Sequence, residues 1–250
     1  MKTKIGAVLF WCLSLFVFQN SSAQGKIIAV KAFDKVIVSP HIEVALVEGD
    51  EEQVFIEKAK LPEHKINVEV EGKTLRVYLE GAKTITKSED RYENGRKVSR
   101  SLYEGTMVSV RISYKKLRAL SIRGEEVVNV MSAISQKDLK LTIYGESKVY
   151  FNSLTVDQLT ASIYGESYLE IKGGLVQKQV YRAYGESEVN TVSLNNVYTK
   201  ITAYGESNFR VNVSGRLKVT CYGETTINYT GDAAVEKGIV IGEAEIRKVG

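Results

Sequence analysis

Apolar and polar residues alternate along most of this chain with a period of two. The alternation is clearest around the tetrapeptide Tyr-Gly-Glu-Ser at 144–147, where Leu141 and Ile143 precede it and Val149 and Phe151 follow it. Alternation with this period is typical of strands that bury one face, whereas a helix repeats its apolar positions every three to four residues. Helix-period segments are scarce, so the pattern predicts an all-β fold.

The tetrapeptide recurs at a nearly constant interval. Its copies begin at Tyr144, Tyr164, Tyr184, Tyr204 and Tyr222, the last with Thr in place of Ser, and degenerate copies occupy 123–126 and 241–244. From the first glycine to the last, the spacings are 21, 20, 20, 20, 18 and 19 residues. A unit of this length suits one turn of a coil with two or three short strands, and coils stacked on one another pair in parallel. We therefore predict a right-handed parallel β-helix or a closely related solenoid, with an antiparallel meander or barrel as the alternative.

The N-terminal part is also strand-like but less regular. Alternating segments are expected at 33–38, 42–47, 54–56, 66–70 and 75–79, as the opening layers of the same β-structure. A charged stretch at 82–105 interrupts the pattern and contains Asn94-Gly95, a dipeptide that favours a two-residue hairpin turn. An exposed hairpin is the expectation there, ahead of a binding loop. The predicted parts are a signal peptide at 1–23, an N-terminal β region at 24–115 and a repeat solenoid at 116–250.

The first residues have the features of an export signal. Lys2 and Lys4 are basic, residues 5–18 are almost all apolar, and Ser21-Ser22-Ala23 supplies the small residues that a signal peptidase accepts. The apolar run is short for a membrane span. The mature chain is therefore expected to be exported without a transmembrane segment, to the periplasm, the outer-membrane surface or the extracellular space.

Removal of the signal changes the charge and the cysteine content. Two of the 34 basic residues lie in the signal, so 32 basic residues remain against 30 acidic ones, and this balance predicts no nucleic-acid partner. Cys221 becomes the only cysteine, so no intramolecular disulfide can form. Because Cys221 falls at an apolar position of its repeat, we expect a small buried side chain there and not a reactive thiol.

The order of the motifs resembles a known family. Phe33-Asp34-Lys35-Val36, then Ile42-Glu43-Val44, then Leu75-Arg76-Val77 and then tandem corner repeats are similar to the secreted bacterial family described as putative auto-transporter adhesin, head GIN domain. Members usually carry Ser-Gly-Ser-Gly-Asp corners, so Tyr-Gly-Glu-Ser departs in detail while the spacing matches. The resemblance implies an extracytoplasmic β-helical protein, common in Bacteroidetes-type bacteria, with no catalytic motif to carry over and no established ligand.

Coils in register would place the corner residues in two ladders, one of tyrosines and one of glutamates. The candidate ligand-binding residues are Tyr144, Glu146, Tyr164, Glu166, Tyr184, Glu186, Tyr204, Glu206, Tyr222 and Glu224. Stacked tyrosines would stabilise the sheet, or would offer a row of aromatic faces to a carbohydrate or an extended peptide. Carboxylates about 5 Å apart would repel by roughly 1 kcal/mol in water, which exposure and splaying relieve. Calcium held by the glutamates together with the corner serines or backbone carbonyls is an alternative, but no metal or cofactor is predicted.

The residues give little support to catalysis. Repeated corners offer near-equivalent carboxylates, whereas an acid and a base need unequal environments. His41 and His64 are the only histidines and lack a metal-ligand spacing, and no nucleophile, Walker or dinucleotide motif occurs. The prediction is an exported, non-enzymatic β-solenoid that acts as an adhesin or surface-interaction protein and binds glycan or protein. A structural cell-envelope protein and a carbohydrate-active enzyme are the alternatives, and the oligomeric state stays open.

Overall fold

Strands make up nearly all the regular structure of the chain. The computed structural model describes residues 25–93 and 96–250, so the signal peptide predicted at 1–23 lies outside the described residues. Eighteen strands belong to one continuous sheet and two belong to a separate hairpin. The one helical element in the described ranges is a single 3-10 turn at Glu63–Lys65, and none of their segments forms an apolar helix long enough to cross a membrane.

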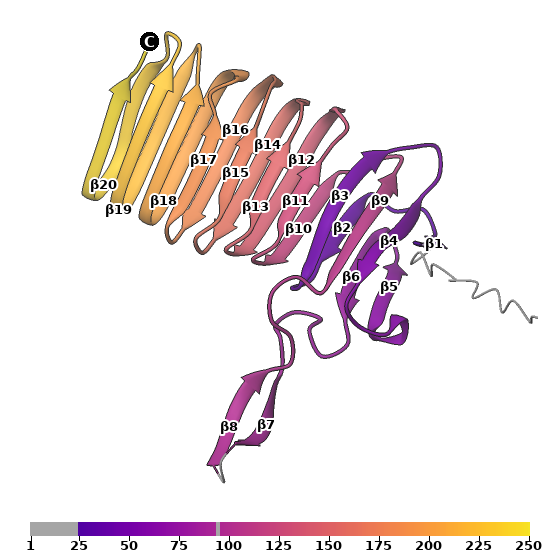
Figure 1. The fold of residues 1–250 in the computed structure, drawn as a ribbon. Coiled ribbons are helices and arrows are strands. Elements are labelled where there is room, and N and C mark those ends of the chain that lie inside the picture. Colours follow the sequence, from indigo (N-terminus) through magenta and orange to yellow (C-terminus); the bar gives the residue numbers. More distant parts are fainter. Residues whose placement is uncertain (1–24, 94–95) are drawn as a thin grey trace, which may run out of the picture.

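The C-terminal part is a stack of coils whose strands pair in parallel (Figure 1). One wall follows the order β10-β12-β14-β16-β18-β19-β20, and a second wall carries β11, β13, β15 and β17 onto the later half of β18. The strands are β10 (Ala119–Gly124), β11 (Val127–Val130), β12 (Ile134–Gly145), β13 (Lys148–Phe151), β14 (Leu154–Tyr164), β15 (Tyr168–Ile171), β16 (Gly174–Tyr184), β17 (Ser187–Thr191), β18 (Leu194–Asn212), β19 (Arg216–Thr230) and β20 (Ala234–Lys248). The parallel solenoid is confirmed, and the antiparallel meander is excluded.

Alternate residues of each wall point into the coil and form the core. Leu141, Ile143, Val149 and Phe151 are all fully buried, as the period-two pattern predicts. The equivalent residues of neighbouring coils stack directly on them because the strands are in register, for example Ile143 on Ile163. Continuous apolar columns therefore hold the coils together, without a disulfide in the described chain.

A third apolar cluster in each repeat, such as Leu154, Val156 and Leu159 or Leu194 and Val197, predicts a further wall of the coil. Leu154, Val156, Leu159 and Leu194 are buried, but Val197 is 44% exposed. Asn196 pairs with Val176 of the preceding coil and takes the inward position instead. The sequence pattern missed this because a polar residue occupies a core position.

Each corner is built from a glycine and a buried hydroxyl. Gly165 has a φ of 112°, and a Cβ added to it would lie 2.4 Å from the carbonyl oxygen of Gly145, one coil earlier. Ser167 is buried and donates a hydrogen bond to that same carbonyl at 2.8 Å. Cys221 is fully buried, as expected, with its thiol 3.2 Å from the Thr225 hydroxyl.

The N-terminal part adds parallel layers to the stack, and antiparallel strands follow beyond them. Strands β2 and β3 pair in parallel with β10 and β11, and β6 and β9 pair in parallel with β2 and β3. Beyond them the pairing turns antiparallel, with β5 on β6, β4 on β9 and β1 on β4. The bounds are β1 (Lys26–Ala29), β2 (Lys35–Val38), β3 (Ile42–Glu48), β4 (Gln53–Ala59), β5 (Ile66–Glu71), β6 (Thr74–Leu79) and β9 (Val108–Tyr114). The expected opening layers are therefore present, whereas the boundary at 115/116 stays a prediction.

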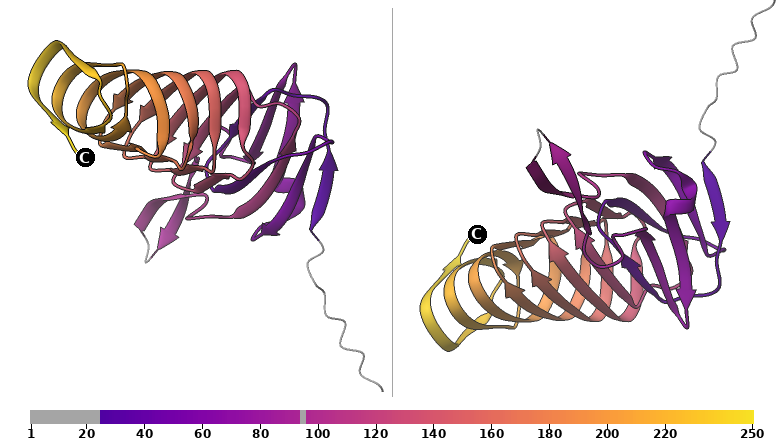
Figure 2. Two further views of the ribbon diagram at one scale, coloured as in Figure 1. Left: turned by 90° about the horizontal axis from the view of Figure 1, so that it is seen from above. Right: turned by 90° about the horizontal axis from the view of Figure 1, so that it is seen from below.

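An arm leaves the body between β6 and β9. It carries the antiparallel strands β7 (Ser88–Glu93) and β8 (Arg96–Ser101), and it projects to one side of the N-terminal end of the stack (Figure 2). Glu93 pairs with Arg96, the register that a two-residue turn requires, although the turn itself at 94–95 lies outside the described residues. The hairpin expected in the charged stretch is therefore present in its two strands.

Candidate ligand-binding site

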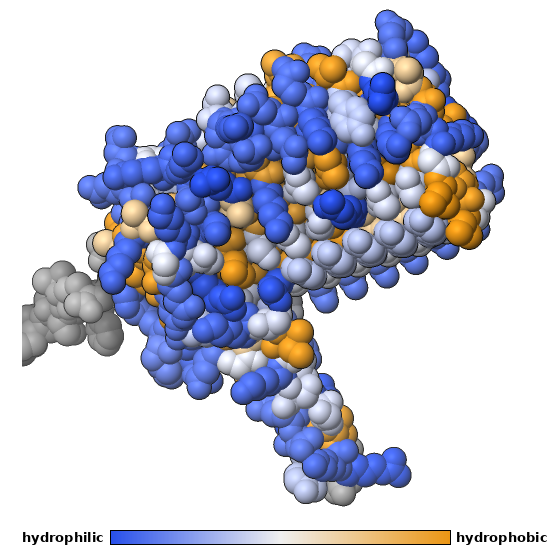
Figure 3. All heavy atoms as spheres, turned by 180° about the vertical axis from the view of Figure 1, so that it is seen from behind, coloured by the Kyte–Doolittle hydropathy of each residue, from blue (hydrophilic) through white to orange (hydrophobic). Residues whose placement is uncertain are grey.

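The five corner tyrosines form one straight ladder. Their rings stack in consecutive pairs, with centroids 4.8–4.9 Å apart and planes within 2–9° of parallel. In-register parallel pairing produces this arrangement, since each tyrosine lies directly over its counterpart in the next coil. Figure 3 shows a row of pale spheres along the edge of the solenoid that adjoins the arm. We call the five stacked residues the tyrosine ladder: Tyr144, Tyr164, Tyr184, Tyr204 and Tyr222.

The ladder presents ring edges and hydroxyl groups to solvent. Each ring face lies against the next ring, yet Tyr144, Tyr164 and Tyr204 remain 37–39% exposed. At one end the Arg123 guanidinium covers the outer face of Tyr144, 4.9 Å from the ring centroid. At the other end Ile241 pairs with Tyr222. The rings therefore adopt the stacked alternative, and because the stacking uses the faces of the inner rings, the ladder offers ring edges to solvent.

The corner glutamates form a second row beside the tyrosines. All seven are exposed, and none makes an ion pair with another described residue. The row consists of Glu125, Glu146, Glu166, Glu186, Glu206, Glu224 and Glu243. Exposure to water, and not pairing with a neighbouring cation such as Lys148, is what relieves their repulsion. The edge of the solenoid is consequently an acidic surface.

The corner serines are not placed to bind calcium beside the glutamates. Ser147 and Ser167 are buried and donate their hydroxyls to glycine carbonyls, so they do not face the glutamate row. The described part of the chain also holds no group of three or more His, Cys, Asp or Glu side chains placed to bind a metal ion. The corner serines therefore do not serve as partner ligands for the glutamates.

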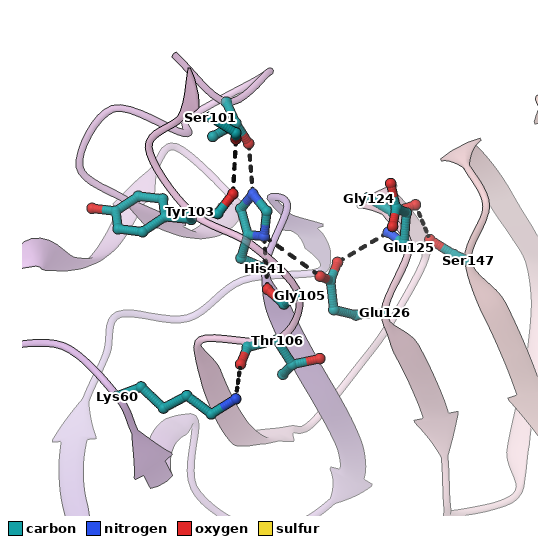
Figure 4. A network of polar contacts seen from close by, with 11 residues as sticks. His41, Lys60, Ser101, Tyr103, Gly105, Thr106, Gly124, Glu125, Glu126 and Ser147 are labelled. Carbon is teal, nitrogen blue, oxygen red and sulfur yellow. Dashed lines mark hydrogen bonds and ion pairs between the residues drawn. The ribbon is translucent and has the colours of Figure 1, made fainter. Parts of the chain in front are cut away.

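A pocket of about 610 Å³ lies at the N-terminal end of the tyrosine ladder. Three segments that are distant in sequence enclose it: the corner at 40–41, the base of the arm at 84–86 and 101–105, and the first two solenoid corners at 123–126 and 144–145. Figure 4 shows His41 and Glu126 pointing toward each other from two of these segments, with the Glu126 carboxyl also directed at the backbone of Glu125. We call this the corner pocket. Its lining exposes more apolar than polar surface, and Ile85 at its rim is 77% exposed.

Glu126 is the buried carboxyl of the corner pocket. Its Oε2 accepts a hydrogen bond from the backbone N–H of Glu125 at 3.0 Å, and its Oε1 lies 3.8 Å from Nδ1 of His41. Burial raises the pKa of the Glu126 carboxyl, an effect that the hydrogen bonds from the backbone partly oppose. The protonated form of Glu126 is therefore favoured relative to a carboxyl in water.

His41 ties the arm to the body of the protein. It is the only described non-glycine residue with a positive φ, at 69°, and this places its ring against the arm. Nδ1 donates to the carbonyl oxygen of Gly105 at 2.8 Å, so in the neutral ring Nε2 accepts from the Thr86 hydroxyl at 2.7 Å. The wall of the corner pocket is thereby fixed by hydrogen bonds at two points of the arm.

Arg123 forms the opposite wall of the corner pocket without a polar partner. Its Nε is buried and lacks a hydrogen-bond acceptor, and neither a hydrogen bond nor an ion pair joins the guanidinium to any other described residue. Its guanidinium stacks on the ring of Tyr144. A guanidinium in such a place has donors available for an incoming acceptor.

The structure brings the predicted site residues together and adds residues that sequence reasoning missed. All ten candidate tyrosines and glutamates lie along one edge. His41 and the arm base could not be placed there from sequence, since they come from another layer. A signal for Glu126 did exist: the first corner reads Arg-Gly-Glu-Glu, with a glutamate where later corners carry the buried serine.

Comparison with known proteins places the chain in a family. Solved structures with a similar fold include a putative adhesin from Bacteroides fragilis (TM-score 0.71, 17% identity, covering 89% of this chain and 94% of that one). A putative adhesin (TM-score 0.64, 19% identity, 90% and 96% coverage) and a putative lipid binding protein (TM-score 0.62, 16% identity, 90% and 96% coverage), both from Parabacteroides distasonis, share it too. No curated protein matches the sequence. The family model described as putative auto-transporter adhesin, head GIN domain, matches residues 32–233, so this chain belongs to that family.

Proposed function

We propose that this protein is an exported, non-enzymatic surface-interaction protein that binds a neutral glycan along the tyrosine ladder. The observation that carries the proposal is the ladder itself: five in-register tyrosines with exposed edges beside a row of exposed carboxylates. Membership of an adhesin family supports a role in surface contact. The hydroxyls and carboxylates provide donors and acceptors at the regular coil spacing, which suits a long, hydroxyl-rich chain.

The geometry sets the mode of binding. Because the ring faces are occupied, the glycan would contact ring edges and hydrogen-bond to the phenol hydroxyls, in place of stacking on the rings. The unpaired glutamates would repel an acidic chain such as a polyuronate, and they accept hydrogen bonds from sugar hydroxyls. Neutral glycans are therefore expected to bind better than acidic ones.

One observation bears on the enzymatic alternative. The corner pocket holds two unequal carboxyls, an exposed Glu125 and a buried Glu126 with a raised pKa. However, the carboxyl of Glu126 is turned toward the N–H of Glu125 and toward His41. Its side chain is only 6% exposed, so it has little surface with which to protonate a substrate. This arrangement supports a binding role more than a catalytic one.

A glycan array tests the proposal. The purified protein would be screened against neutral and acidic glycans and mucins, with calcium and with a chelator, at low and moderate salt. We expect binding to neutral glycans that does not depend on calcium. Tyr164→Phe and Tyr184→Phe keep the stacked rings and remove one hydroxyl each, and together they should lower the affinity about tenfold.

The matched control is Tyr150→Phe, since Tyr150 lies on a different wall of the solenoid. Equal binding by the control and by the ladder variants would remove the ladder as the contact site. If no glycan binds in any condition, the proposal fails, and the structural cell-envelope role or a protein partner takes its place.

A further inference from the structure

We propose that the corner pocket is a saccharide subsite that holds one neutral sugar unit at the N-terminal end of the tyrosine ladder. This rests on the proposed function and makes it more specific, because it gives the bound glycan an anchored end. The pocket and the ladder are continuous, since Tyr144 and Gly145 line the pocket and Tyr144 is the first ring of the ladder. A chain that lies along the ladder therefore enters the pocket directly.

The unpaired groups of the pocket match the chemistry of a sugar. Arg123 has hydrogen-bond donors without an acceptor, and the exposed carboxylate of Glu125 makes no ion pair with another described residue. A sugar carries hydroxyl groups that both accept and donate, so neighbouring hydroxyls of one ring can accept from the guanidinium and donate to a carboxylate. A purely anionic or purely cationic group would satisfy only one of these two.

The pocket also supplies apolar contact that the ladder lacks. The rings of the ladder are stacked on each other, so the C–H face of a sugar cannot lie on them. In the pocket, Ile85 is exposed at the rim and Pro40 and Tyr103 are part of the lining. A concave site with a mainly apolar lining and a few convergent polar groups is the usual form of a small-molecule site.

The charges of the pocket select against acidic sugars. The exposed carboxylates of Glu104 and Glu125 line it, against the single cation Arg123. The nearest carboxylates of the ladder add to the same negative potential. A uronic acid would meet Arg123 but would be repelled by the surrounding carboxylates, so a neutral sugar is the expected occupant.

Calorimetry with oligosaccharides of increasing length tests the subsite. The probes are glucose, mannose and galactose oligosaccharides from disaccharide to hexasaccharide, with uronic-acid oligosaccharides for comparison. We expect Arg123→Gln and Ile85→Asp to weaken binding of every length by roughly tenfold or more. Tyr184→Phe should weaken only the longer chains, since Tyr184 lies two coils beyond the pocket.

The control is Arg210→Gln, an exposed arginine on another wall. If Arg123→Gln binds all lengths as the native protein does, while the tyrosine variant loses the long chains, the subsite is refuted and the proposed function stands. If disaccharides bind through Arg123 and length makes no difference, the ladder fails and the subsite stands. No binding by the native protein to any probe would overturn both, and circular dichroism checks that each variant is folded.

Discussion

Glu126 occupies, in the first corner of the solenoid, the position that Ser147 occupies in the second. Each lies two residues after a corner glycine, and the two glycines, Gly124 and Gly145, are paired. Ser147 donates its hydroxyl to the carbonyl of Gly124 at 2.8 Å, whereas Glu126 turns its carboxyl to the N–H of Glu125 and to His41. The corner nearest the arm therefore buries a titratable group where later corners bury a neutral one.

This substitution should make stability depend on pH. The pKa of Glu126 is raised above its ordinary value of 4.5, mainly by burial, so the native state binds the proton more tightly than the unfolded chain does. Stability should fall as pH rises from about 4.5 through the raised pKa, and it should level off above it. Glu126→Gln and Glu126→Ser should both remove this fall. Urea unfolding of the three proteins between pH 4 and 8 measures it, and parallel curves for all three would contradict the assignment.

The corner glycines should tolerate no side chain. Gly165 has a φ of 112°, and a Cβ would lie 2.4 Å from the Gly145 carbonyl oxygen, so Gly165→Ala combines backbone strain with overlap against the neighbouring coil. We expect a loss of about 3 kcal/mol or more in unfolding free energy. Gly72 is the control: its φ is also positive, at 59°, but nothing lies within 4 Å of its Cβ position, so Gly72→Ala should lose only about 1 kcal/mol. Equal losses would show that close stacking of the corners does not matter.

The corner hydroxyls should contribute to stability through single hydrogen bonds. Ser167 is buried and donates to Gly145, so Ser167→Ala leaves that carbonyl without this donor and should lower the unfolding free energy by about 1 kcal/mol. Ser135 is exposed, and Ser135→Ala should change stability by less than about 0.5 kcal/mol. Urea denaturation compares the two variants. Equal effects would mean that the Ser167 bond adds nothing beyond what water supplies.

The repeat made most of the solenoid predictable. Alternation with period two identified the inward columns such as Leu141 and Ile143, and the regular glycine spacing implied one corner per coil. Both signals arise from backbone geometry that every coil repeats, so a single sequence displays them several times. Where a coil departs from the repeat, as at Asn196, the pattern failed because a polar side chain took an inward position.

The corner pocket could not be predicted for a physical reason. Its walls come from layers that are far apart in sequence. They meet because the arm is inserted between β6 and β9, in a part of the chain where no sequence repeat indicates which residues will be neighbours. Stacked tyrosines were one of the two arrangements that the sequence allowed. The choice between stacked rings and rings with open faces depends on side-chain conformation, and in the structure Tyr164 and Tyr184 lie face to face at 4.8 Å.

Two substitutions of Tyr184 should distinguish the contribution of ring stacking to stability from the contribution of the phenol hydroxyl to glycan binding. Tyr184 stacks on both Tyr164 and Tyr204 at 4.8 Å, so Tyr184→Ala removes two ring pairs and should lower the unfolding free energy by about 1–3 kcal/mol. Tyr184→Phe keeps both pairs and removes a hydroxyl that has no partner in the described chain, so its stability should stay within about 0.5 kcal/mol of the native protein.

Thermal or urea unfolding measures how much the stacked rings stabilise the protein, and glycan affinity measures how much the Tyr184 hydroxyl contributes to binding. Tyr150 belongs to a different wall, where its ring makes one tilted contact with the ring of Tyr168 at 5.7 Å and has Lys172 over its face, so Tyr150→Ala serves as the control for losing a ring outside the ladder. If Tyr184→Ala loses no more stability than this control, the ladder does not stabilise the stack. The stacked rings would then have no structural role in the coil, and the exposed hydroxyl edges would be the only contribution of the ladder.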